Sequence, residues 1–94
     1  MAAALQIRNN ESESRFECDV DGKLSVVEYQ MAPDKIIFTH TEVPSELSGR
    51  GIAQKMVTAA LDHARKNKLR VVTLCSYVAS YIERHPEYRD LVSD

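Results

Sequence analysis

The chain has 94 residues, a hydrophobic fraction of 44% and a formal net charge of −2 at pH 7. This size fits one domain with a small core, so we expect residues 1–94 to form a single domain with residues 1–4 disordered. No apolar run is long enough for a membrane span, and the acidic balance gives no overall attraction to nucleic acid or to an anionic membrane. Cys18 and Cys75 lie far apart without metal or redox spacing, which predicts free thiols, no metal site and a cytoplasmic location.

The first half of the chain predicts an antiparallel meander. Phe16, Cys18 and Val20 alternate with polar residues, a pattern typical of a strand with one buried face. Asp21-Gly22 suits a two-residue hairpin turn, and Pro33-Asp34 suits a second tight turn. The predicted strands cover residues 5–8, 15–20, 24–31 and 35–43.

The second half predicts a helix, a short buried strand over residues 71–74 and a final helix over residues 76–84. Apolar residues recur at helical spacing from about Gly51 to Asn67, which tolerates a left-handed backbone at a helix end. The first helix makes a βαβ crossover if the strands on either side of it pair. His85-Pro86 ends the final helix. The expected fold class is therefore mixed α+β, an antiparallel meander followed by a βαβ unit and a C-terminal helix.

The turn Gly49-Arg50-Gly51-Ile52-Ala53 joins the meander to the first helix. Backbone N–H groups converge in a glycine-containing turn of this kind, and the helix dipole adds partial positive charge there. Glycine also leaves room for a phosphate to approach the backbone. We expect a phosphate site at this turn, although an ordinary helix N-cap explains such a short motif equally well.

Three motifs follow one another along the chain: His40-Thr41-Glu42-Val43-Pro44, the glycine turn, and a segment from Cys75-Ser76-Tyr77-Val78 to His85-Pro86-Glu87-Tyr88. Together with the strand order, over roughly residues 5–92, they resemble a short single-domain branch of the GCN5-related N-acetyltransferase (GNAT) superfamily. The phosphate signature of that superfamily is Gln or Arg, two residues, Gly, one residue, then Gly or Ala. Gly51 and Ala53 match this signature, whereas Ser48 replaces the usual Gln or Arg.

The resemblance implies a minimal GNAT fold and an acetyl-CoA-dependent N-acetyltransferase acting on an unidentified primary amine, either a small molecule or a protein. It implies that the pyrophosphate binds the turn and that the pantetheine lies between strands 35–43 and 71–74, where these strands splay. The alternative is a non-catalytic acyl-CoA-binding or protein-interaction module, because the chain lacks the helix pair that normally helps to form the acceptor site. The expected cofactor-binding residues are Val43, Ser48, Gly49, Arg50, Gly51, Ile52, Ala53, Cys75 and Tyr77.

Cys75 is the first candidate catalytic residue, and it occupies the place of the superfamily's usual Asn. It ends a strand and precedes a helix, whose dipole lowers the pKa of a thiol. A thiolate there accepts the acetyl group as a covalent relay, or the thiol protonates the departing CoA. The residue-level alternative is a small buried side chain without a chemical role.

His40, Glu42 and Tyr81 complete the candidate catalytic set. We expect His40 and Glu42 on the same strand face as Phe38, where either deprotonates an incoming amine; the alternative is a hydrogen-bonded histidine and a solvated glutamate. Tyr81 lies near the position of the superfamily's usual tyrosine acid. Tyr77 shares its helix face, so one of the two donates a proton, lines the pantetheine channel or only packs.

Four cations cluster around the end of the first helix, and they form either a solvated face or a contact for a phosphate or an acidic partner. A nucleic-acid-binding domain is disfavoured because the chain is acidic and shows no strand in which aromatic and basic residues alternate. We therefore expect neither nucleic acid nor a membrane as a partner, and the sequence leaves the oligomeric state open. The four residues are Arg65, Lys66, Lys68 and Arg70.

Overall fold

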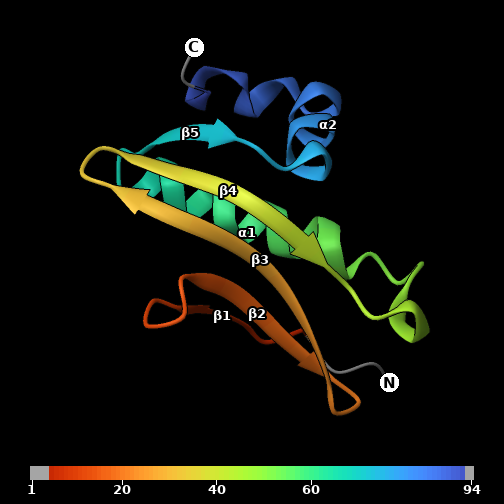
Figure 1. Ribbon diagram of the computed structural model, residues 1–94. Helices are drawn as coiled ribbons and strands as arrows, with labels where there is room; N and C mark the ends of the chain where they lie inside the picture. Colours follow the sequence, from red (N-terminus) through yellow and green to blue (C-terminus); the bar gives the residue numbers. More distant parts are fainter. Residues whose placement is uncertain (1–4, 93–94) are drawn as a thin grey trace.

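The computed structural model describes residues 5–92 as a five-stranded sheet with one long helix across one face (Figure 1). The predicted α+β class is confirmed, with its meander, βαβ unit and C-terminal helix. The expected disorder of residues 1–4 lies outside the described residues. The elements are β1 Ile7–Asn10, β2 Arg15–Val20, β3 Lys23–Ala32, β4 Lys35–Glu42, the 3₁₀ helix η1 Ser45–Leu47, α1 Ile52–Lys66, β5 Arg70–Thr73, α2 Ser76–Arg84 and the 3₁₀ helix η2 Pro86–Leu91.

The strands follow one another across the sheet in chain order, β1 to β5. The first four are antiparallel, and β5 is parallel to β4, so α1 makes the expected crossover. Two-residue turns close both later hairpins, as predicted from Asp21-Gly22 and Pro33-Asp34. Asp21 and Gly22 have φ of 55° and 76°, as a type I′ hairpin turn requires.

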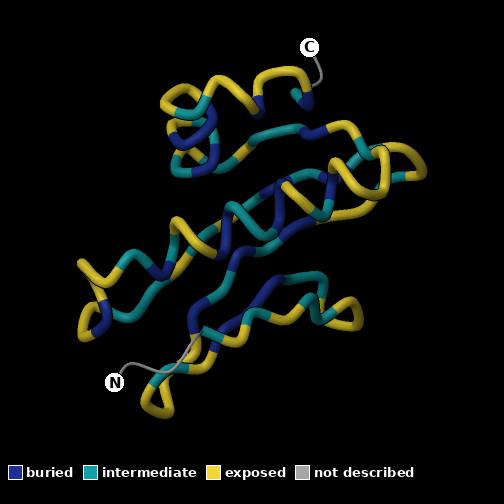
Figure 2. Tube along the Cα trace, turned by 180° about the vertical axis from the view of Figure 1, so that it is seen from behind, coloured by how far each residue is buried: buried dark blue, intermediate teal, exposed yellow. Residues whose placement is uncertain are grey.

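The core lies between α1 and the sheet face that it covers, and buried positions line both elements in Figure 2. The apolar residues of α1 repeat every three or four positions, so one stripe of the helix is buried. Helix α2 and η2 pack against α1, and α2 also contacts the β4–β5 edge. Among the described residues, no helix packs on the opposite face, which we call the open face (Figure 1). The α1 residues in the core are Ile52, Met56, Val57, Ala60, Leu61 and Ala64.

A β-bulge at Thr39 divides β4 into two halves with opposite parity. Tyr29 of β3 pairs with Phe38, but the preceding residue Glu28 pairs with His40, so Thr39 is an extra residue in β4. Tyr29 and Phe38 are buried beneath α1. Beyond the bulge, Thr41 rather than His40 therefore occupies the α1 face of the strand.

The end of α1 differs by one residue from the sequence prediction. Lys68, with φ of 58°, has the left-handed backbone expected of Asn67, whose φ is −97°. The N–H of Leu69 donates to the carbonyl of Ala64 at 2.8 Å, and the N–H of Lys68 donates to that of Arg65 at 3.2 Å. This pair of bonds is a Schellman motif, in which the residue after the C-cap is left-handed.

Strand β5 begins and ends one residue earlier than the strand predicted over residues 71–74, and it is more exposed than predicted. Val71 is fully buried, but the strand ends at Thr73 and the side chain of Leu74 is 71% exposed. The open face at this edge has no covering helix among the described residues, so an apolar run alone was a poor guide to burial.

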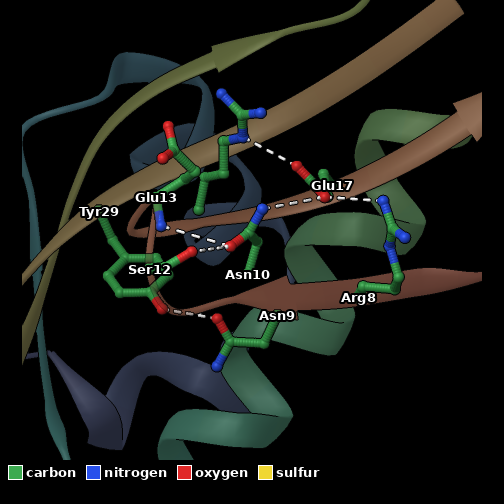
Figure 3. A network of polar contacts seen from close by, with 8 residues as sticks. Arg8, Asn9, Asn10, Ser12, Glu13, Glu17 and Tyr29 are labelled. Carbon is green, nitrogen blue, oxygen red and sulfur yellow. Dashed lines mark hydrogen bonds and ion pairs between the residues drawn. The ribbon is translucent and has the colours of Figure 1, made fainter.

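A buried carboxylate breaks the simple alternation predicted for β2. Glu17 points to the open face, yet its side chain is only 6% exposed because two arginines and an asparagine surround it (Figure 3). It accepts hydrogen bonds from Arg8 at 2.7 Å, Arg15 at 2.8 Å and Asn10 at 3.2 Å. The bond from Arg15 is the main cause that lowers the pKa of Glu17. Nearby, Tyr29 donates to Asn9 at 2.5 Å and ties β3 to β1.

We predict that Glu17→Gln lowers the Tm at pH 7 by roughly 5 °C, because it removes the charge that both arginines bind. A carboxyl with a lowered pKa in the folded state stabilises the protein fully above its unfolded-state pKa, and this contribution is lost as the pH falls through the folded pKa. The Tm difference between wild type and variant should therefore shrink in acid. Scanning calorimetry from pH 7 to pH 3 measures it.

Glu11→Gln is the matched control, because Glu11 is exposed in the β1–β2 turn. An equal Tm loss in both variants, or a Glu17→Gln difference that does not change with pH, would contradict a stabilising role for the ionised Glu17.

Candidate active site

Strands β4 and β5 separate where the bulge begins. Their parallel pairing runs only as far as Phe38 and Thr73. The carbonyl of Phe38 then accepts hydrogen bonds from the N–H groups of both Leu74, at 2.9 Å, and Cys75, at 3.1 Å. Because a single carbonyl accepts from two consecutive N–H groups, the regular β4–β5 hydrogen-bond ladder ends here. Strand β4 continues past the end of β5 (Figure 1).

A pocket of about 410 Å³ lies on the α1 side of this separation. Its walls come from the end of β4, η1, the glycine turn, the first turn of α1 and the first turn of α2. All of the residues predicted to bind a cofactor line it except Arg50 and Cys75, and Leu47 and Gln54 line it without having been predicted. The lining residues are Val43, Leu47, Ser48, Gly49, Gly51, Ile52, Ala53, Gln54 and Tyr77.

The backbone of the glycine turn is suited to bind an anion. Gly49 and Gly51 have φ of 84° and 75°, a conformation that side-chain-bearing residues rarely adopt. Gly51 is the N-cap of α1 and supplies no side-chain acceptor to the first helical turn. Within the described part of the chain, no residue accepts a hydrogen bond from the backbone N–H groups of residues 49–54. These donors at a positive helix end are available to a phosphate.

Cys75 is the N-cap of α2 and lies where β4 and β5 separate. Its Sγ is 3.4 Å from the hydroxyl oxygen of Thr41. Burial raises the pKa of the Cys75 thiol, but hydrogen bonds from that hydroxyl, from the start of α2 and from the N–H of Thr41 outweigh burial, so the pKa lies below its ordinary value. Cys18 is fully buried, and burial raises the pKa of its thiol. Only Cys75 therefore has the setting of a reactive thiol.

The two tyrosines of α2 lie in different surroundings. Tyr77 lines the pocket, and partial burial raises the pKa of its phenol. Tyr81 is buried between helices, where its hydroxyl contacts that of Thr58 on α1 and its ring stacks on His85 with centroids 3.9 Å apart. Tyr81 does not line the pocket, so Tyr77 is the better placed of the two to donate a proton there.

The expectation that His40 and Glu42 share the face of Phe38 is wrong. The bulge at Thr39 turns both onto the open face, away from the pocket. His40 Nε2 and the Glu42 carboxylate lie 3.2 Å apart, and both side chains are mostly exposed. The bulge also brings Thr41 onto the α1 face, where it contacts Cys75. Regular alternation along the strand would have put Thr41 on the open face.

The basic cluster, which runs from the last turn of α1 to the first residue of β5, is partly occupied by the C-terminal segment. Arg65 donates two hydrogen bonds of 3.0 Å to the Asp90 carboxylate and one of 2.7 Å to the carbonyl of Glu87. Arg70 donates to the carbonyls of Asp90 and Val92 at 2.9 and 2.7 Å. These two cations hold η2 and the residue after it against α1 and β5, which is a structural role.

Comparisons with known proteins agree with this geometry. The sequence model of the GCN5-related N-acetyl-transferase family matches residues 15–91. Protein NATD1 of Gallus gallus is 29% identical over 85 residues, which cover 87% of this chain and 77% of that protein. Protein NATD1 of Homo sapiens is 28% identical, with coverage of 87% and 75%. A solution NMR structure of a GCN5-like protein from Staphylococcus aureus superposes with a TM-score of 0.76 at 28% identity, and covers 98% of this chain and 91% of that one.

The separated strands, the glycine turn and the pocket between them define an acyltransferase-like α+β protein. The family match extends over most of the chain, so the chain belongs to the GCN5-related N-acetyltransferase family. No helix of the described residues is long and apolar enough to cross a membrane.

We predict that Thr41→Val slows alkylation of Cys75 by iodoacetamide at pH 7 and shifts the pH profile of the reaction upward. The variant removes the hydroxyl that stabilises the thiolate but preserves the side-chain shape. Peptide mass spectrometry at timed intervals measures the rate at each cysteine, and Cys18 should react far more slowly in both proteins.

Thr73→Val is the matched control, because Thr73 is a β5 residue of the same type within the regular β4–β5 pairing. Equal rates in wild type and Thr41→Val would show that this hydroxyl does not activate Cys75.

Proposed function

We propose that the protein is an acetyl-CoA-dependent N-acetyltransferase. One observation supports this most strongly: the pocket extends from the glycine turn to Val43 and Tyr77, although Cys75 itself does not line it. Two of its lining residues, Val43 and Tyr77, follow Thr41 and Cys75 by two positions each. The free N–H groups of the turn would hold the pyrophosphate, and the pocket would take the pantetheine toward the thiol.

Acetyl-CoA would supply an activated acetyl thioester to this site. In the relay mechanism, the Cys75 thiolate attacks the thioester carbonyl and CoA leaves as a thiol after taking up a proton. A primary amine then attacks the acetyl-cysteine, loses a proton and restores the Cys75 thiolate. In direct transfer, the amine attacks the thioester itself, and the thiol of Cys75 or the hydroxyl of Tyr77 protonates the departing CoA.

The amine acceptor would reach the thioester through the separation of β4 and β5 from the open face. His40 lies on this face beside Glu42 and across from Glu28, and a neutral imidazole can accept a proton from an incoming ammonium group. On this exposed face, His40, Glu42 and Glu28 can be reached by an amine of either a small molecule or a protein. The two free thiols also favour the cytoplasm, which keeps cysteines reduced.

A non-catalytic acyl-CoA-binding or protein-interaction module is the second candidate. The bare open face favours it, because no helix of the described residues completes an acceptor site over His40 and Glu42. The two candidates agree on the cofactor and differ in whether acetyl transfer follows binding.

We predict that acetyl-CoA binds and stabilises the protein. At ~100 times the Kd, the added stability is ~2.7 kcal/mol, and the Tm should rise by roughly 10–20 °C. ATP is the phosphate control and should have little effect. Ser48→Arg, which introduces one of the two residues usual in the family at this position, should tighten binding of CoA about threefold to tenfold by calorimetry. Absence of a shift at millimolar acetyl-CoA would rule out the enzyme and the acyl-CoA-binding module, and would leave only a protein-interaction module with the family fold.

We predict that wild type, incubated with acetyl-CoA without an acceptor, gains one acetyl group on Cys75, and that Cys75→Ser gains none there. Intact-mass and peptide mass spectrometry measure this gain, and addition of a primary amine should remove the label. A protein that binds acetyl-CoA and acetylates amines without a labelled intermediate uses direct transfer. Binding without label and without turnover of any amine tested would favour the non-catalytic module.

A further inference from the structure

The tip of the β2–β3 hairpin lies beside η1 and the glycine turn, and one ion pair connects the hairpin to each of them. Arg50 Nη1 in the turn is 3.2 Å from the Asp21 carboxylate at the hairpin tip. In the second pair the cation is on the hairpin: Lys23 Nζ of β3 is 3.4 Å from the Glu46 carboxylate of η1. Residues that are 29 positions apart in the sequence, Asp21 and Arg50, are therefore in direct contact.

Arg50 lies between two residues that line the pocket, Gly49 and Gly51, but it does not line the pocket itself. Its guanidinium is directed instead to Asp21. The side chains of Arg50 and Asp21 are 53% and 69% exposed, so water and salt screen the pair and its net stability is small. A ligand with more negative charge than one carboxylate can therefore displace Asp21.

We propose that Asp21 competes with the pyrophosphate of CoA for Arg50 and so limits the affinity of the protein for its cofactor. This inference depends on the proposed function. The pyrophosphate carries more charge than Asp21 and accepts paired hydrogen bonds from a guanidinium. When the Arg50 side chain rotates from Asp21 toward the pocket, its guanidinium exchanges the Asp21 carboxylate for the pyrophosphate of CoA. Arg50 thereby supplies a phosphate-binding side chain in place of the usual Gln or Arg, which Ser48 replaces.

The hairpin turn makes this competition testable without unfolding the protein. Asp21 is at the first central position of a type I′ turn with φ of 55°, and asparagine suits that position at least as well. Asp21→Asn therefore removes the charge and retains the turn. Asp34→Asn is the matched control, because Asp34 is an exposed residue of the other two-residue turn, between β3 and β4.

The experiment is a double-mutant cycle in which calorimetry measures the Kd of CoA for wild type, Asp21→Asn, Arg50→Gln and the double variant. We expect Asp21→Asn to tighten binding about threefold, the size of an exposed ion pair, and Arg50→Gln to weaken it. In the Arg50→Gln background, Asp21→Asn should change the Kd no more than Asp34→Asn does. The tightening should persist with dephospho-CoA, which lacks the 3′-phosphate but keeps the pyrophosphate. The Arg50 Nε–H resonance of the unliganded wild type should move when Asp21 is replaced by Asn, and it should also move when CoA is added to wild type.

Three results would overturn the inference while CoA still binds wild type. Weaker binding by Asp21→Asn would show that the ion pair holds the turn in its binding conformation. Equal tightening in the presence and absence of Arg50 would reduce the effect to general electrostatics. Loss of the tightening with dephospho-CoA would assign Arg50 to a different phosphate. If wild type does not bind CoA at all, the proposed function fails and the inference fails with it.

Discussion

The carbonyl of Phe38 determines the geometry of the candidate site. It accepts the N–H groups of both Leu74 and Cys75, and no further rung of the β4–β5 ladder forms beyond it. The strands then separate, which leaves space on the α1 side for a pocket and places Cys75 at the start of α2. The bulge at Thr39 acts at the same level of the sheet and brings the Thr41 hydroxyl to the sulfur. The separation of the strands, the pocket and the surroundings of the Cys75 thiol thus all depend on the same local arrangement of hydrogen bonds.

Most of the fold could be predicted from local chemistry, because each element has its own signal. Asp21-Gly22 and Pro33-Asp34 gave the hairpins, and apolar spacing gave α1. The bulge left no comparable signal: Thr39 is one of several β-branched residues in its strand, and the extra residue is defined only by pairing with Glu28 and Tyr29. His40 and Glu42, which follow Thr39, were therefore predicted on the wrong face of the sheet.

The candidate site divides in the same way. The glycine turn could be recognised because its residues are consecutive, and the pocket contains most of them. Partners that come from distant elements could not be recognised, and these are Thr41 for Cys75, Asp21 for Arg50 and Thr58 for Tyr81. Arg65 and Arg70 were grouped by sequence as a basic cluster, whereas tertiary structure uses both to bind the C-terminal segment. The chemistry of a single side chain was easier to predict than the identity of its neighbour.

The one-residue bulge also has a consequence for how such a site can change during evolution. Because Thr39 is the extra residue of β4, loss of its codon would restore a regular strand in which His40 follows Phe38 directly. Regular alternation from Phe38 would then keep the imidazole on the open face and the Thr41 hydroxyl on the α1 face, beside the sulfur that it contacts today. The pairing of hydroxyl and thiol can therefore survive a deletion at this position. An alignment gap at Thr39 among relatives would leave the activation of the thiol unchanged, whereas a substitution at Thr41 would change it.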